Sequence, residues 1–312
     1  MKKYLCTVPL LLLLCFALSC KQGENVSAEK GAEPAITIDT AISSDGIPIS
    51  YEVRGKGEPA LIFVHGWCCD RSYWNEQLPH FAQKYKVVSV DLAGHGESGL
   101  DRKAWTMDAF GDDVVAVAEK LNLKQVVLIG HSMGGIVILK AALKMPERIL
   151  GLVAVDEFFN LEAKNTPEEI EKLLVPFRSN FTDAVGNVVR TMFTSKSDSK
   201  LVERIIADIS ACPPSVGLGA VTGTDGMAEF EYNIDNRLTR TLQELKAPIV
   251  FINSDSEPTE VEINRRYLPS FNAKVVPGVG HFVMLERPEI FNGLLEESIQ
   301  EFIQQAARLE GI

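Results

Sequence analysis

The chain has 312 residues, enough for one large domain with a sizeable apolar core. Its hydrophobic fraction of 46% and charged fraction of 23% are ordinary for a globular protein. The formal net charge of −11 and the lack of a long Lys/Arg run argue against a basic surface that binds nucleic acid or anionic lipid.

The first residues have the pattern of an export signal. Two lysines precede the apolar run Leu5–Leu18, which is too short to cross a bilayer comfortably. The run ends in "ALSC", similar to a bacterial lipobox, with its leucine one place nearer the cysteine than usual. We expect residues 1–19 to be a signal peptide, Cys20 to carry a lipid anchor, and residues 20–34 to be a flexible linker. The protein is then exported to the cell envelope, in the periplasm or at the outer membrane; simple cleavage and release is the alternative.

Short apolar runs rich in Val and Ile follow the linker and predict the strands of a buried sheet. The runs at residues 35–43 and 47–55 flank a Ser-Asp-Gly turn and predict an antiparallel edge hairpin. The later runs resemble strands of a parallel sheet that helices cover on both faces. They lie at residues 60–66, 86–92, 125–131, 150–156, 247–254 and 273–281. Helices are predicted between them, notably Met107–Leu121 and Gly135–Lys144, and a last one begins near Pro288. This alternation predicts a doubly wound α/β sheet.

The pattern changes between residues 157 and 246. Helical stretches such as "TPEEIEKLLVPF" and "KLVERIIADIS" occur there without a clear buried strand. We interpret residues 157–246 as a helical cap inserted into one α/β core, formed by residues 35–156 and 247–312. Within the cap, residues 217–236 are expected to be irregular or mobile.

The sequence "VVLIGHSMGG" carries the most specific motif. Gly130-His131-Ser132-Met133-Gly134 is a G-x-S-x-G pattern between a predicted buried strand and a predicted helix. Such a turn presents Ser132 above the sheet edge, and Gly130 and Gly134 leave room where the strand and the helix nearly collide. A nucleotide-binding loop does not fit, because no Gly-Lys-Ser/Thr follows.

A serine hydroxyl needs a base to take its proton, and the chain has five histidines. We assign His281 as the base, because it follows the last predicted strand in a loop that can overhang Ser132. His131 adjoins the serine but is expected to point elsewhere. We interpret His65 and His95 as loop-bracing residues.

The base needs a carboxylate that orients it and stabilises the imidazolium. Asp255 and Asp156 both follow predicted strands and can both reach the histidine. We favour Asp255, because it follows the strand after the cap, and we keep Asp156 as the alternative acid.

These motifs together resemble the serine-type α/β-hydrolase family over residues 35–306. Beside the serine motif, the matches are "HGW" at 65–67, "DLAGHGES" at 91–98, "NSD" at 253–255 as the acid loop and "GVGH" at 278–281 as the base loop. The resemblance implies an α/β-hydrolase fold: a mostly parallel eight-stranded sheet with helices on both faces and an inserted helical cap. It also implies an oxyanion hole made by the main-chain N–H groups of Trp67 and Met133. Ser132 excludes the branch with an Asp nucleophile.

The resemblance implies a serine hydrolase, most similar to carboxylesterases, that cleaves a small ester or related acyl substrate through an acyl-enzyme. We expect no cofactor, no metal, a small-molecule substrate, and membrane contact only through the lipidated N-terminus. A proline iminopeptidase-like aminopeptidase, a C–C bond hydrolase, a haloperoxidase-like enzyme and a ligand sensor that acts through a partner protein remain alternatives. The aminopeptidase would need acidic cap residues to bind a free amine. The candidates are Glu168, Glu169, Glu171, Glu229 and Glu231, which also fit a solvated acidic face.

Two sets of side chains in and near the cap have less specific patterns. Aromatic residues can line an apolar pocket or form the core of the cap. These are Phe158, Phe159, Phe177 and Tyr232. Three cysteines lie outside the export segment: Cys68, Cys69 and Cys212. Their odd number predicts no disulfide framework, and "HGWCC" lacks the ligand spacings of a zinc site. We interpret Cys68 and Cys69 as small residues that pack behind the oxyanion turn.

Overall fold

The computed structural model describes residues 35–157, 161–162, 166–222, 225–231, 233–268 and 270–311. The expected signal peptide, Cys20 and the linker lie outside the described residues. Within these ranges, no helix combines the length and the apolar character needed to cross a membrane.

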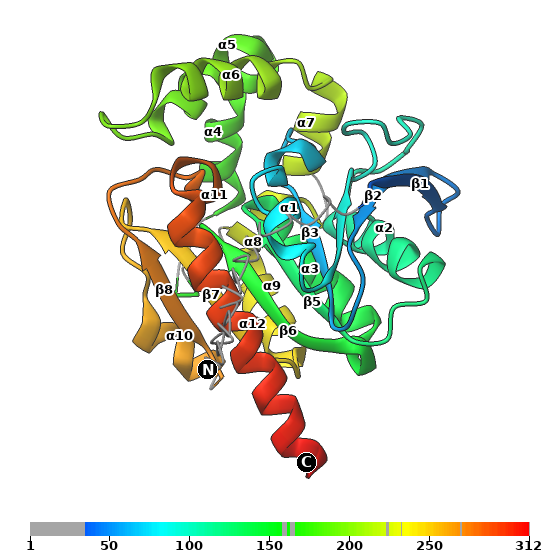
Figure 1. The fold of residues 1–312 in the computed structure, drawn as a ribbon. Helices are drawn as coiled ribbons and strands as arrows, with labels where there is room; N and C mark the ends of the chain where they lie inside the picture. Colours follow the sequence, from blue (N-terminus) through cyan, green and yellow to red (C-terminus); the bar gives the residue numbers. More distant parts are fainter. Residues whose placement is uncertain are drawn as a thin grey trace, which may run out of the picture. The chain divides into compact units, whose positions relative to one another are not determined.

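The strands of the described residues form one eight-stranded sheet in the order β1-β2-β4-β3-β5-β6-β7-β8 (Figure 1). Their bounds are Thr37–Ile42 (β1), Pro48–Arg54 (β2), Ala60–Val64 (β3), Lys86–Val90 (β4), Val126–His131 (β5), Ile149–Val155 (β6), Ile249–Ser254 (β7) and Asn272–Val276 (β8). β2 is antiparallel to both β1 and β4, and every other pair is parallel. The predicted mostly parallel sheet with an antiparallel edge is confirmed.

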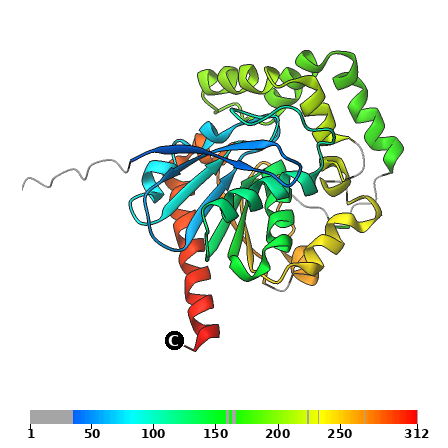
Figure 2. The ribbon, with the colours of Figure 1, turned by 90° about the vertical axis from the view of Figure 1, so that its right-hand side faces the viewer.

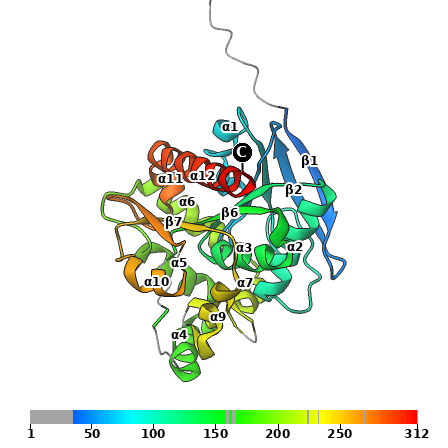
Figure 3. The same ribbon diagram turned by 90° about the horizontal axis from the view of Figure 1, so that it is seen from below.

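Helices cover both faces of this sheet, as Figure 3 shows in a view from below. α2 (Met107–Lys120) and α3 (Met133–Lys144) lie on one face, and α1 (Leu78–Phe81) and α12 (Pro288–Glu310) lie on the other. Side chains of β3 alternate between the two layers: Ile62 packs with the α2–α3 core, and Phe63 packs with the α1–α12 core. Strands buried on both faces therefore account for the continuous apolar runs in the sequence.

Several short helices were not expected from the sequence. They are η1 (Arg71–Trp74), η2 (Pro146–Arg148), α10 (Val261–Tyr267), α11 (Val283–Glu286) and also α1. Each has seven residues or fewer, so it is too short to display a helical period that pattern reading can detect.

The cap consists of helices in its described residues, and the predicted helical insertion is confirmed. Its elements are α4 (Pro167–Ser179), α5 (Phe181–Thr191), α6 (Ser199–Ser210), α7 (Pro214–Val221), α8 (Met227–Glu231), η3 (Ile234–Asn236) and α9 (Arg237–Glu244). Figures 1 and 2 show α4, α5, α6 and α7 over one end of the sheet. Because cap residues share a cavity with Trp67 and Ser132, which follow β3 and β5, this end holds the carboxyl ends of the parallel strands.

The expectation that residues 217–236 are irregular is wrong for the described part of this segment, which includes α8 and most of α7. Gly217 and Gly219 serve close packing instead. A Cβ at Gly217 would collide with the ring of Phe181, and one at Gly219 would collide with Trp105. Phe230 is fully buried and packs into the main core. Tertiary burial thus overrides the weak helical propensity of the local sequence.

Glycines in α3 and α12 provide a matched test of how closely each helix is packed against its neighbours. A Cβ at Gly134, in α3, would lie 2.6 Å from the carbonyl oxygen of Val64, whereas a Cβ at Gly293, in α12, would meet nothing within 4 Å. We expect Gly134→Ala to lower the free energy of unfolding by about 3 kcal/mol or more, because backbone must move to admit the methyl group. Gly293→Ala should raise it by about 0.5–1 kcal/mol through helix propensity. Urea unfolding followed by circular dichroism measures both, and equal effects would contradict the packing argument.

Candidate active site

Ser132 occupies a strained turn between β5 and α3. Its backbone has φ of +51° and ψ of −126°, a conformation that a non-glycine residue adopts only when its surroundings enforce it. The Ser132 N–H donates to the carbonyl of Val155 at 3.0 Å, which fixes the turn against β6. Gly134 allows α3 to approach β3, and Gly130 allows its first turn to approach β5. The half-buried Ser132 side chain lines a cavity beneath the cap.

His281 lies in the loop after β8 and lines the same cavity as Ser132. Its Nδ1 lies 2.6 Å from Oδ2 of Asp156, the residue that follows β6. Asp156 is buried and has φ of +52°, and its other oxygen, Oδ1, accepts the N–H of Ser254 at 2.6 Å. Because the carboxylate takes the Nδ1–H, Nε2 of His281 is left as the nitrogen that can accept a proton.

Asp255 does not contact His281, and the expectation that it is the orienting acid is wrong. Asp255 is exposed, and its Oδ1 accepts the N–H of Gly278 at 2.7 Å in the turn after β8. Both candidates follow strands that end at the same edge, but β6 is the direct neighbour of β5, whereas β7 is one strand farther out. The alternative residue, Asp156, is therefore the one that the fold pairs with the histidine.

Two main-chain donors flank the serine. Met133 is the first residue of α3, so its N–H has no partner within the helix. Trp67 lies in the turn after β3, and its indole Nε1 donates to the carbonyl of Gly217 in α7 at 2.8 Å. In the described part of the chain, neither main-chain N–H has a hydrogen-bond acceptor. Both are therefore available to an oxygen bound at the site.

His131 is a positioning residue that the sequence did not reveal. Its Nε2–H donates to the main-chain carbonyl of His281 at 3.0 Å, and the two imidazole rings are 4.6 Å apart between centroids. Burial, reinforced by the neighbouring His281, holds the pKa of His131 well below its usual range, so the ring is neutral. Contrary to the expectation that it points elsewhere, His131 lines the cavity and supports the loop that carries His281.

The other two buried histidines brace loops, as interpreted from the sequence. Nδ1–H of His65 donates to the carbonyl of Gly66 at 2.8 Å, and its Nε2 accepts the N–H of Leu92 at 3.1 Å. Burial lowers the pKa of His65 to about 4, which keeps the ring neutral and both bonds intact. Nδ1–H of His95 donates to the carbonyl of Ala93 at 3.0 Å.

The cap also holds the loop that carries His281. The main-chain N–H of His281 donates to the carbonyl of Met192, just after α5, at 2.7 Å. The N–H of Gly280 donates to Glu286 at 2.8 Å, and a Cβ at Gly280 would lie 2.8 Å from Cα of Phe193. The loop and the cap are therefore packed backbone against backbone.

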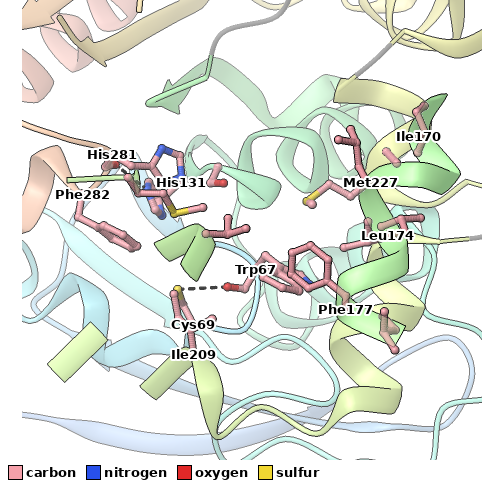
Figure 4. A pocket seen from close by; sticks show the side chains of 17 residues that line it. Trp67, Cys69, His131, Ile170, Leu174, Phe177, Ile209, Met227, His281 and Phe282 are labelled. Carbon is pink, nitrogen blue, oxygen red and sulfur yellow. Dashed lines mark hydrogen bonds between the residues drawn. The ribbon is translucent and has the colours of Figure 1, made fainter. Parts of the chain in front are cut away.

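The cavity has a volume of about 290 Å³ and is predominantly apolar. Figure 4 shows His281, His131 and Phe282 at one end and cap residues at the other. The side chains toward the cap include Trp67, Ile170, Leu174, Phe177, Leu218 and Met227. Among the described residues, no Asp, Glu, Lys or Arg lines it. Of the aromatic candidates, Phe177 is a lining residue, whereas Phe158, Phe159 and Tyr232 lie outside the described residues.

Residues 59–288 match the family model described as the alpha/beta hydrolase fold. The chain belongs to the α/β-hydrolase fold family. Similar hydrolases include 3-oxoadipate enol-lactonase 2 of Acinetobacter baylyi, 22% identical over 86% of this chain and 99% of that protein. The strigolactone esterase RMS3 of Pisum sativum is 31% identical, over 35% of this chain and 44% of its own.

Solved structures of hydrolases resemble the whole folded region. A thermophilic esterase from Thermogutta terrifontis has a TM-score of 0.72 and 25% identity, covering 85% of this chain and 99% of its own. Est816, described as an N-acyl homoserine lactone degrading enzyme, has a TM-score of 0.70 and 26% identity, covering 82% of this chain and 99% of its own. The chain is thus a hydrolase with esterase-like neighbours.

The two aspartates provide a matched pair of variants. Asp156→Asn should slow labelling of Ser132 by a fluorophosphonate about 10³–10⁴-fold, because the amide stabilises the wrong histidine tautomer. Asp255→Asn should label at nearly the wild-type rate, since its carboxylate contacts only the Gly278 turn. Time-resolved intact-protein mass spectrometry measures the labelling. A slow Asp255→Asn variant beside a normal Asp156→Asn variant would reverse the assignment.

Proposed function

We propose that the protein is a serine hydrolase that cleaves small, uncharged, apolar carboxylic esters through an acyl-enzyme. One observation carries the proposal: Ser132 and the Asp156-oriented His281 line one apolar cavity. A nucleophile, a base and a carboxylate in this relation are what acyl transfer requires. The esterase-like neighbours support the same class of reaction.

The proposed reaction has two halves. Oγ of Ser132 attacks the ester carbonyl while Nε2 of His281 takes the hydroxyl proton. The N–H groups of Trp67 and Met133 stabilise the oxyanion that develops, and His281 returns the proton to the departing alcohol. Water then attacks the acyl-enzyme with His281 again as base, which releases the carboxylic acid and restores Ser132. Asp156 orients His281 and stabilises the imidazolium.

The lining of the cavity supports an ester over an aminoacyl substrate. A free amine needs a buried carboxylate beside it, because an unpaired ammonium is costly to bury. Glu168, Glu169 and Glu171 are exposed on α4, and Glu229 pairs with Arg237 at 2.6 Å. The side chain of Glu231 lies outside the described residues. One relative is named an enol-lactonase, and one structural neighbour is described as degrading an N-acyl homoserine lactone; these names support the inclusion of cyclic esters in the proposed substrate class.

We also propose that the hydrolase works in the bacterial cell envelope, tethered through a lipid on Cys20. The support is the N-terminal pattern of a basic pair, a short apolar run and "ALSC". Metabolic labelling with a fatty-acid analogue tests the anchor, with Cys20→Ser as the unlabelled control. An anchored protein should partition into the membrane fraction, and the variant should not.

A substrate panel tests the proposed reaction. We expect sustained turnover of p-nitrophenyl acetate and butyrate and of a simple lactone, with much slower cleavage of the hexadecanoate, which exceeds a cavity of about 290 Å³. Aminoacyl arylamides should be poor substrates. Ser132→Ala should lower kcat about 10⁶-fold, to background.

Three results would point to the alternatives. Preferred cleavage of aminoacyl arylamides would indicate an aminopeptidase, and cleavage of β-diketones without ester turnover would indicate a C–C bond hydrolase. A single stoichiometric burst without further turnover would indicate a ligand sensor. Each of these results would contradict the esterase proposal.

A further inference from the structure

Three soft ligands meet beside the candidate active site, although none is close to the others in the sequence. Sγ of Cys68, Sγ of Cys212 and a ring nitrogen of His95 all lie within 4.8 Å of one another. Cys68 lies in the turn after β3, His95 follows β4, and Cys212 follows α6 in the cap. The local spacing in "HGWCC" could not indicate this cluster, because each ligand comes from a different segment of the chain.

The imidazole of His95 is arranged as metal-binding histidines are. Its Nδ1–H donates to the carbonyl of Ala93, which fixes the tautomer and leaves a lone pair on Nε2. His95 is only 5% exposed, and its Nε2 is buried without a hydrogen-bond partner. A buried acceptor without a partner is costly, so its place beside two thiols calls for an explanation.

The arrangement of the two thiols also fits metal binding. Cys68 and Cys212 are both buried and form no disulfide. Cys68 has φ of +56°, a strained conformation for a residue with a side chain. Cys69, the adjacent thiol, donates instead to the carbonyl of Trp67 at 3.4 Å and stands outside the cluster. The strained residue is therefore the one whose sulfur joins the cluster.

We propose that Cys68, Cys212 and His95 bind one thiophilic d¹⁰ metal ion, Zn²⁺ or Cu⁺. Thiolate and imidazole are the ligands that both ions prefer. On binding, two S–H bonds break, two metal–sulfur bonds form, the imidazole adds its lone pair, and two protons leave to solvent. With Zn²⁺ the two thiolates and the neutral imidazole give a site of zero net charge, which suits its burial.

Such an ion would join the cap to the oxyanion turn. Cys212 belongs to the cap, and Cys68 adjoins Trp67, whose indole already donates to Gly217 in α7. Binding of an ion to the folded state alone raises stability by mass action. We therefore expect the metal-loaded protein to unfold at a higher temperature than the metal-free protein.

The test uses the full chain with Cys6, Cys15 and Cys20 replaced by serine, so that only three thiols remain. Reduced protein is loaded with Zn²⁺, with Cu⁺ under anaerobic conditions, or with Co²⁺ as a spectroscopic probe. We expect about one ion per chain by elemental mass spectrometry, sulfur-to-cobalt charge-transfer bands, and release of two protons per Zn²⁺. Loss of a residue that only supports a ligand typically lowers metal affinity about 10–100-fold. Loss of a ligand itself should lower the affinity by more than this in each of three variants: Cys68→Ala, Cys212→Ala and His95→Gln.

Cys69→Ala is the matched control and should bind the ion like the parent chain. Thermal unfolding without metal confirms that each variant folds. Binding that survives in Cys68→Ala or His95→Gln would place the ion elsewhere and overturn the proposal, as would the absence of binding to fully reduced protein. The chain could instead be isolated with a Cys68–Cys212 disulfide, which makes it two hydrogen masses lighter. If that chain did not take up metal after reduction, the proposal would also be overturned. Retention of Zn²⁺ or of Cu⁺ alone after dialysis identifies which ion the site selects.

Discussion

The site depends on how closely α3 approaches the sheet. The main chain at Gly134 packs against the carbonyls of Val64 and His65, so the serine turn and the turn after β3 are held as one unit. That contact fixes the turn that carries Ser132 and Met133 against the turn that leads to Trp67. Main-chain groups fixed in this way need no reorganisation when charge develops on a bound oxygen. The side chain of Trp67 lines the cavity, whereas the side chain of Met133 is buried in the core.

The order of the strands in the sheet determines which aspartate contacts His281. Asp156 follows β6, between the strand that carries Ser132 and the strand whose last N–H, from Ser254, holds its second oxygen. A buried carboxylate that accepts an imidazole N–H and a backbone N–H is well satisfied in spite of its burial. Asp255, one strand farther out, is exposed and accepts the N–H of Gly278 in the turn after β8. Position relative to the nucleophile strand thus separates two aspartates whose sequence contexts are alike.

The sequence could predict the sheet because each central strand is buried on both faces, and its motifs could predict that Ser132 and His281 come together, as they do in one cavity. It could not separate Asp156 from Asp255, since both follow apolar strands and only the fold determines which carboxylate reaches the imidazole. It misjudged residues 217–236, whose glycines indicate flexibility in isolation but accommodate Phe181 and Trp105 in the folded chain. The meeting of Cys68, His95 and Cys212 depends on three separate turns, so no local spacing could indicate it.

The hydrogen bond from His281 to Met192 gives the cap a second role besides shaping the cavity. Asp156 holds the imidazole of His281, while His131 and the cap hold its main chain, at the carbonyl and at the N–H respectively. A displacement of α5 would therefore also remove a support of the loop that carries His281. One main-chain hydrogen bond thus links a wall of the cavity, which includes Met192, to the loop that carries His281.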